Sequence, residues 1–256
     1  MKRYIAALFI LFTLASRACA AEPAAKDPNQ LFYSANRSYG AGDYKKALEE
    51  YLMVLDTGVE NGRLHYNIGN GFFKLGKIGY AILCYERARR LIPQDGDLKS
   101  NLAYAKTMAG TSYPDDSAIR RLTGYIKAPF LDMNLNALAN LTLALYLIIM
   151  VVLAIFIFNR IIARKGILLF IVLTAIFLVA LSAVSVRYYD EEILRHGIII
   201  EKDVECKYEP IDKSTTYYKL HEGDEVTVLT TREGWRRIKR PDGKLAWIKK
   251  EAVEII

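Results

Sequence analysis

Few side chains in this 256-residue sequence are of a type and spacing that support catalysis. The three histidines, His65, His196 and His221, fall into no Ser-His-Asp, Cys-His or metal-ligand pattern. The acidic pair Asp115-Asp116 stands alone in a segment that we interpret as a solvated linker. We therefore expect no enzymatic activity, no metal site and no cofactor.

The three cysteines give no further chemistry. Cys19 lies in the N-terminal leader, while Cys84 and Cys206 fall in separate predicted domains, so we expect no structural disulfide. Each of the latter two thiols is interpreted as a small buried hydrophobe. Removal of the predicted leader, with Lys2, Arg3 and Arg17, would lower the formal net charge from +7 to +4, and so modest a charge gives no support for nucleic-acid binding.

Residues 1–20 predict a secretory signal peptide. A basic start, Met1-Lys2-Arg3, precedes an apolar stretch at 4–15, and Ala18-Cys19-Ala20 fits a small-x-small cleavage site. The alternative is a lipoprotein signal acylated at Cys19, which Ser16-Arg17-Ala18 fits poorly because no leucine-like residue stands three before the cysteine. A leader directs the export of the chain behind it, so residues from Ala21 onward should emerge outside the cytoplasm.

Two apolar blocks without a charged residue, Leu138–Phe158 and Ile167–Val186, account for much of the 52% hydrophobic content. They predict transmembrane helices at 138–158 and 167–187. The loop predicted between them, 159–166, carries Arg160, Arg164 and Lys165 and no acid, so the positive-inside rule places it in the cytoplasm. Both flanking domains should then lie in the periplasm or exterior of a bacterial inner membrane. Because the apolar blocks hold no charged residue, we expect no ion or proton path.

The N-terminal region repeats at an offset of 34 residues, which is the period of tetratricopeptide (TPR) repeats. The second copy, with Gly69, Ala81, Tyr85, Ala88 and Pro93, resembles the TPR signature, whereas the first copy is degenerate. A lone helix at 97–108 is interpreted as a cap. The residues matched at this offset are Asn36 and Asn70, Tyr39 and Phe73, Gly42 and Gly76, Ala47 and Ala81, and Tyr51 and Tyr85.

The TPR resemblance implies a peptide-binding groove lined by the first helix of each repeat. Asn36 and Asn70 are the stronger candidates, because their amides can hold an extended backbone through paired hydrogen bonds. The alternative is that the groove aromatics pack the array. A carboxylate clamp is not expected, because Phe32 and Asp97 stand where its lysines would be. The predicted groove residues are Phe32, Asn36, Tyr39, Arg63, Tyr66, Asn70, Phe73 and Lys74, with Ser100 and Tyr104 extending the surface.

Residues 196–256 predict several short strands. Residues 225–229 and 235–239 alternate between apolar and polar side chains, and Pro241-Asp242-Gly243 is a tight turn. Gly223-Asp224, Gly234-Trp235 and the stretch ending in Trp247 resemble the bacterial SH3 (SH3b) family. We expect Trp247 in the core of a small barrel, leave core or surface open for Trp235, and take Tyr208, Tyr217 and Trp235 as the candidate recognition surface.

The order of these parts resembles the BatE-type proteins of the bacterial aerotolerance operon. That resemblance implies association with membrane proteins bearing von Willebrand-type domains and with a MoxR-type ATPase. The expected function is a membrane-anchored scaffold, and the alternative is an adaptor that binds cell-wall peptide and recruits a wall-processing enzyme.

The predicted fold class is multidomain, with all-α TPR hairpins, a two-helix transmembrane hairpin and a small all-β SH3-like barrel. Its boundaries are a signal peptide at 1–20, a TPR module at 28–110, a linker at 111–137, spans at 138–158 and 167–187 with a loop at 159–166, and an SH3-like domain at 196–256.

Overall fold

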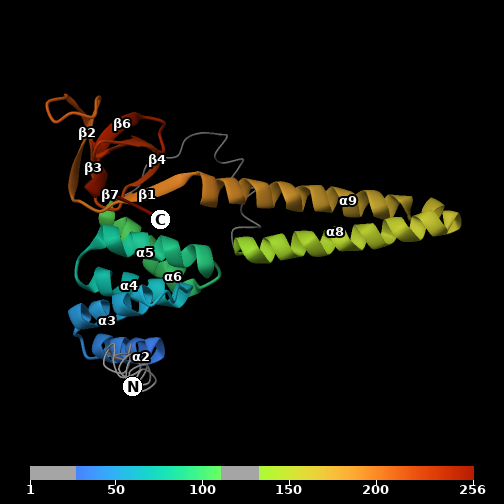
Figure 1. Cartoon of the computed structure of the whole chain (residues 1–256), viewed down its shortest axis with the longest axis horizontal. Coiled ribbons are helices and arrows are strands. Elements are labelled where there is room, and N and C mark those ends of the chain that lie inside the picture. The colour runs from blue at the N-terminus through green and yellow to red at the C-terminus, as the bar shows by residue number, and fades with distance from the viewer. Residues whose placement is uncertain (1–26, 111–132) are drawn as a thin grey trace, which may run out of the picture.

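The computed structural model describes residues 27–110 and 133–256, which form three parts (Figure 1). A helical module and a β domain lie against one another at one end of a long hairpin of two helices. The predicted signal peptide and most of the predicted linker at 111–137 lie outside the described residues. The expectation of separate all-α and all-β parts with two apolar helices is confirmed.

The helical module consists of two helical hairpins and a final helix. Its first helices, α2, α4 and α6, begin 34 residues apart, so the predicted repeat of helical hairpins is confirmed. Glycines with φ of +83° at Gly42 and +72° at Gly76 allow the turn within each hairpin. The helices are α2 (Pro28–Gly40), α3 (Tyr44–Asp56), α4 (Gly62–Lys74), α5 (Ile78–Leu91) and α6 (Gly96–Ala109).

Small residues set the close contact between α4 and α5. A Cβ added at Gly69 would lie 2.6 Å from the ring of Tyr85 and 3.3 Å from the Ala81 carbonyl oxygen. Ala81 and Tyr85 are themselves buried. The small residues Gly69 and Ala81 therefore permit the close packing of α4 against α5.

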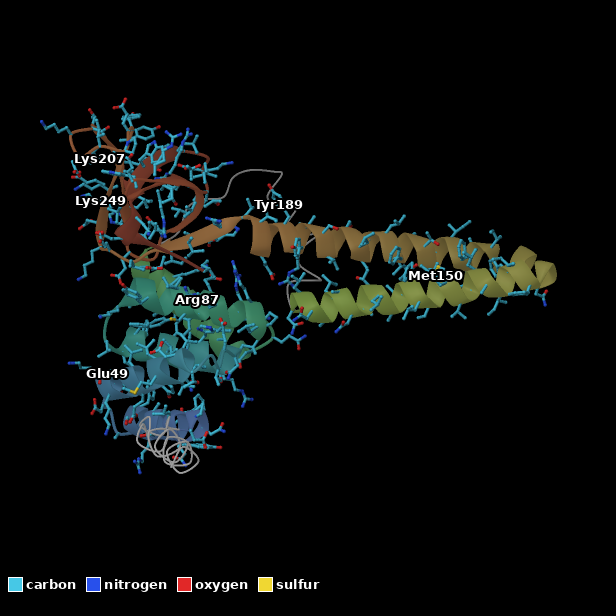
Figure 2. The ribbon with its side chains drawn as sticks, viewed as in Figure 1. Glu49, Arg87, Met150, Tyr189, Lys207 and Lys249 are labelled. Atoms are coloured by element: carbon cyan, nitrogen blue, oxygen red, sulfur yellow. The ribbon has the colours of Figure 1, made fainter. Side chains whose placement is uncertain are left out.

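The described part of the hairpin consists of α8 (Leu135–Phe158) and α9 (Arg160–Tyr188), which pack side by side. Most apolar side chains on both helices point outward, as at Met150 (Figure 2). The prediction of an eight-residue loop at 159–166 is wrong, because α9 already begins at Arg160. Arginine, lysine and alanine favour helix, so the helix extends beyond the apolar block that defines the span.

A π-helical turn, η2 (Tyr189–Ile193), and the single residue Leu194 connect α9 to the β domain. All pairings in the seven-stranded sheet are antiparallel, in the order β3-β2-β6-β5-β4-β1-β7. The strands are β1 (Arg195–Ile199), β2 (Asp203–Lys207), β3 (Thr216–His221), β4 (Glu225–Arg232), β5 (Trp235–Lys239), β6 (Leu245–Lys249) and β7 (Val253–Ile255).

Cys84 and Cys206 are free and buried, one in the helical module and one in the β domain. Burial raises the pKa of each thiol to about 12, so both remain protonated near neutral pH. The interpretation of these two cysteines as buried hydrophobes is confirmed.

Replacing Gly69 by alanine should destabilise the protein by about 1–3 kcal/mol, because the new methyl group overlaps the buried ring of Tyr85. The measurement is denaturant unfolding of the detergent-solubilised chain, followed by helical circular dichroism. Gly96→Ala is the matched control, since nothing lies within 4 Å of its added Cβ. Equal stability of the two variants would contradict the proposed overlap.

Candidate functional site

The predicted groove residues lie on the first helices of the two hairpins, but they differ in exposure. Phe32 and Tyr39 pack partly against the core of the first hairpin, and Tyr66 and Phe73 against that of the second. Figure 1 shows where α2, α4 and α6 lie in the module. The aromatic residues therefore contribute to packing, whereas Arg63 and Lys74 are exposed.

Asn36 and Asn70 have matching hydrogen bonds inside the array. The Tyr51 hydroxyl donates to Asn36 Oδ1 over 2.6 Å, and the Tyr85 hydroxyl donates to Asn70 Oδ1 over 2.7 Å. Each acceptor also receives a bond from the next first helix, from Asn67 Nδ2 at 3.3 Å and from Asn101 Nδ2 at 3.0 Å respectively. The two asparagines thus tie each hairpin to its successor.

These bonds limit what the asparagine amides offer to a ligand. Paired recognition of a peptide backbone requires both the carbonyl oxygen and the amino group of the amide. At Asn36 and Asn70 the carbonyl oxygen already accepts two protein donors. Asn36 and Asn70 therefore stabilise the contacts between helices, a role that the repeat pattern alone did not reveal.

The extension of the groove onto α6 is partly exposed. The ring of Tyr104 lies 5.7 Å from that of Phe73, yet 58% of Tyr104 remains accessible. Ser100 donates to the Gly96 carbonyl within its own helix. Tyr104, Arg63 and Lys74 are exposed. Asn36 and Ser100 are exposed too, but both are hydrogen-bonded within the protein.

Removing the amide of Asn70 should cost stability as well as any binding, because the buried Tyr85 hydroxyl would lose its acceptor. We expect Asn70→Ala and Tyr85→Phe to show a coupling of about 1 kcal/mol in a double-mutant cycle of unfolding free energies. Additive effects of the two substitutions would contradict a structural bond between these side chains.

The three candidate residues of the β domain separate into two groups. Tyr208 and Tyr217 are 57% and 41% exposed, with ring centroids 4.6 Å apart. Trp235, for which the sequence leaves core or surface open, is buried at 9% exposure and offers little surface to a ligand. Trp247, expected in the core, is only partly buried. Alternation along β6 explains this outcome, because Ala246 and Ile248 point inward and the residue between them faces the other side.

The β domain docks on α5 through apolar and polar contacts. Ile198 of β1 belongs to the apolar cluster of the second hairpin. The Gly79 backbone N–H donates to Glu222 Oε1 over 2.7 Å, and a Cβ at Gly79 would lie 2.6 Å from the Ile199 carbonyl oxygen. Arg87, labelled in Figure 2, donates to the Ile255 carbonyl over 2.7 Å.

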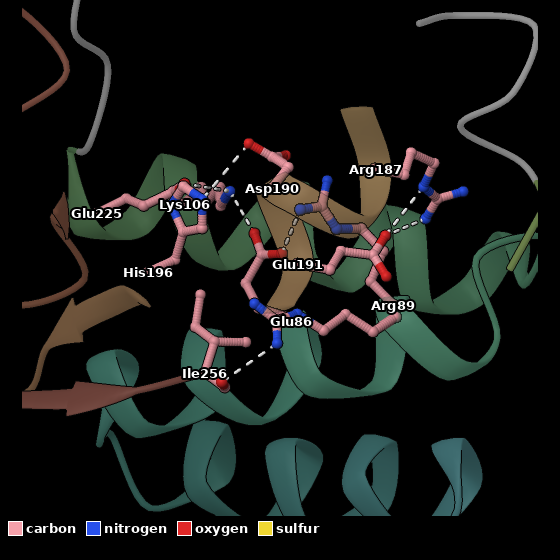
Figure 3. Close-up of polar contacts among 10 residues, drawn as sticks. Glu86, Arg89, Lys106, Arg187, Asp190, Glu191, His196, Glu225 and Ile256 are labelled. Atoms are coloured by element: carbon pink, nitrogen blue, oxygen red, sulfur yellow. Dashed lines mark hydrogen bonds and ion pairs between the residues drawn. The ribbon is translucent and has the colours of Figure 1, made fainter. Parts of the chain in front are cut away.

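Ion pairs connect the three parts beside this contact (Figure 3). Glu86 of α5 is buried, and its carboxylate pairs with Arg89 and with Lys106 of α6, each at 2.6 Å. Burial alone would raise the pKa of Glu86, but the two cations hold it below its ordinary value. Lys106 also lies 3.9 Å from Glu225 of β4.

His196 continues the network toward the hairpin. Its Nδ1 lies 3.6 Å from a Glu225 carboxylate oxygen, and its Nε2 lies 3.6 Å from Asp190 of η2. Contact with Asp190 raises the pKa of His196 above its ordinary 6.5, against the opposing effect of burial, and Glu225 raises it further. The imidazolium form thus holds two carboxylates from different elements together.

The ion pairs around Glu86 and His196 lie at the junction of the helical module, the hairpin and the β domain. This junction was not predicted from the sequence, although Glu86 gave a signal for it. Glu86 stands in α5 between the largely apolar stretch at 78–85 and the basic residues Arg87, Arg89 and Arg90. Such a carboxylate needs cationic partners when it is buried. Arg89 and Arg90 follow at i+3 and i+4 and are therefore candidate partners, whereas Lys106 on the next helix is not indicated by any local spacing.

No family model matches the chain, and no curated protein is significantly similar to it. Within residues 27–110 and 133–256, no group of three His, Cys, Asp or Glu side chains is placed to hold a metal ion.

The junction should weaken as the pH rises. The folded-state pKa of His196 is raised, so its stabilising charge is fully present below about pH 6.5 and is lost as the pH passes the raised value. We expect the melting temperature of the wild type to fall more than that of His196→Gln between about pH 6 and about pH 8. His221→Gln, on an exposed position of β3, is the control and should keep the wild-type dependence. Identical pH profiles for His196→Gln and the wild type would refute this assignment.

Proposed function

We propose that this protein is a membrane-anchored scaffold whose helical module and β domain bind other proteins on one side of a membrane. The observation that carries the proposal is the position of both modules at the same end of the α8–α9 hairpin (Figure 1). Two candidate spans of 24 and 26 residues, Leu135–Phe158 and Gly166–Glu191, are long and apolar enough to cross a bilayer. A hairpin of two spans returns the chain to the side from which it entered.

The exposure of the hairpin supports an apolar environment around it. Only 6% of each apolar window is buried inside the protein, so a lipid surrounding would remove a large apolar surface from water. A soluble core helix of similar composition would instead be covered by other elements. The basic residues at 160–165 lie at the start of α9, which supports placing that end in the cytoplasm and both modules outside it.

The modules are proposed to be a TPR array and an SH3b domain. Support for the first comes from helical hairpins that recur every 34 residues with small residues at the helix contact. Support for the second comes from short antiparallel strands in one seven-stranded sheet. Both families act by binding other molecules, and a shared anchor raises the effective concentration of two partners held together.

The proposed partners are those implied by the resemblance to BatE-type proteins. They are membrane proteins with von Willebrand-type domains, in a complex served by a MoxR-type ATPase and concerned with oxygen or stress tolerance. Arg63, Lys74 and Tyr104 provide cationic and aromatic surface on the helical module for such a partner. Arginine and aromatic residues are frequent at energetically important interface positions.

The experiment measures recovery of a co-expressed von Willebrand-type membrane protein with the tagged full-length chain in mild detergent. Arg63→Ala/Tyr104→Ala should reduce recovery roughly tenfold, because loss of about 1.4 kcal/mol weakens binding by that factor. Lys45→Ala/Lys46→Ala removes exposed residues of α3 and serves as the matched control.

Wild-type recovery by the control and loss by the groove variant would support the proposal. Failure of the wild-type chain to retain that partner would contradict the proposal that it binds von Willebrand-type membrane proteins. Equal recovery of the partner by all variants would instead show that these residues of the helical module are not the binding surface.

A further inference from the structure

A cavity of about 620 Å³ lies where the helical module, the end of the hairpin and the β domain meet. Its size is within the range of small-molecule sites, which are commonly about 300–1,000 Å³. It is beside the ion pairs of Figure 3, and its walls differ in chemistry. No contact proposed above for the scaffold uses this space.

One wall is apolar and belongs to the last turns of α9. Val179, Ala183 and Val186 line the cavity there, and the two valines are 57% and 49% exposed. All three fall within the candidate span Gly166–Glu191. If the hairpin crosses a bilayer, this wall lies near the end of the span, where acyl chains meet lipid headgroups.

The opposite wall is basic and belongs to the helical module. Arg89 and Arg90 of α5 and Lys99 of α6 line it. Arg89 is engaged by Glu86, but its side chain remains 51% exposed. A guanidinium has five N–H donors, so an arginine that pairs with one carboxylate can still donate to a second anion.

The acidic side chains of the cavity have cationic partners of their own. Glu86 pairs with Arg89 and Lys106, and Glu191 pairs with Arg187. Asp190 and Glu225 lie on either side of His196, toward the β domain. The cations that line the α5–α6 wall suit a phosphate, and the apolar α9 wall suits a hydrocarbon chain.

We propose that this cavity binds one phospholipid, with its phosphate held by Arg89, Arg90 and Lys99 and an acyl chain against Val179, Ala183 and Val186. This inference rests on the proposed membrane anchoring. A free phosphate would satisfy only the basic wall, whereas a phospholipid satisfies both walls and is present at the end of a span. The bound lipid bridges the helical module and α9.

The experiment uses the full-length protein, delipidated in detergent, titrated with phosphatidylglycerol and examined by native mass spectrometry. Ala183→Phe fills the cavity from the apolar wall without changing charge, and Arg90→Gln/Lys99→Gln removes two cations while leaving both partners of Glu86 in place. Each should weaken retention of one lipid roughly tenfold, equivalent to about 1.4 kcal/mol. Leu178→Phe, on an exposed position of α9 outside the cavity, is the control and should bind as the wild type does.

Equal lipid retention by the wild type and every variant would overturn the proposal. Failure of the wild type to retain lipid at any concentration would overturn it too, as would full displacement of the lipid by an equal concentration of glycerol 3-phosphate. Membrane anchoring is measured separately, by resistance of the wild type to alkaline extraction from membranes. An extractable chain would overturn the proposed function, whereas a resistant chain without lipid retention would overturn only the lipid site.

Discussion

Helix α5 is covered by other elements around most of its circumference, and the arrangement of the helical module and β domain depends on this burial. It packs on α4, α6 and β1, and eight of its residues, from Gly79 to Ala88, are buried. Backbones approach closely where side chains are small, as at Ala81 and at Gly79 beside the Ile199 carbonyl. Because Ile198 of β1 joins the same apolar cluster, separating the two modules would expose the core of the second hairpin.

The buried polar side chains near this core are tolerated because each has a hydrogen-bond or ion-pair partner. Burial raises the pKa of the Tyr51 hydroxyl to about 12 and raises that of Tyr85 as well, so both hydroxyls stay protonated and donate to Asn36 and Asn70. Glu86 is the charged counterpart, since it keeps its charge only beside Lys106 and Arg89. An unpaired carboxylate at this depth would cost several kcal/mol, so the pair with Lys106 also holds α6 against α5.

Local patterns in the sequence predicted much of the architecture. The 34-residue offset located the helical hairpins, and the alternation predicted at 225–229 falls within β4, where Val226 and Val228 are buried. The tertiary contacts were harder, because they join residues such as Gly79 and Glu222 that are far apart in the chain. Asn36 shows the same difficulty at the predicted groove. The 34-residue spacing identified it as a candidate, but only the structure shows that its side-chain carbonyl oxygen already accepts a hydrogen bond from Tyr51.

The junction also determines how the hairpin is coupled to the two modules. Only Leu194 separates η2 from β1, so the backbone itself fixes the end of α9 close to the β domain. The helical module contacts this assembly through the Gly79 N–H to Glu222, through Lys106 to Glu225, and through Arg87 and Arg90 to the last strand and the residue after it. The orientation of α5 relative to α9 therefore depends on these noncovalent contacts, and a change in charge at His196 acts at the point where the two are coupled.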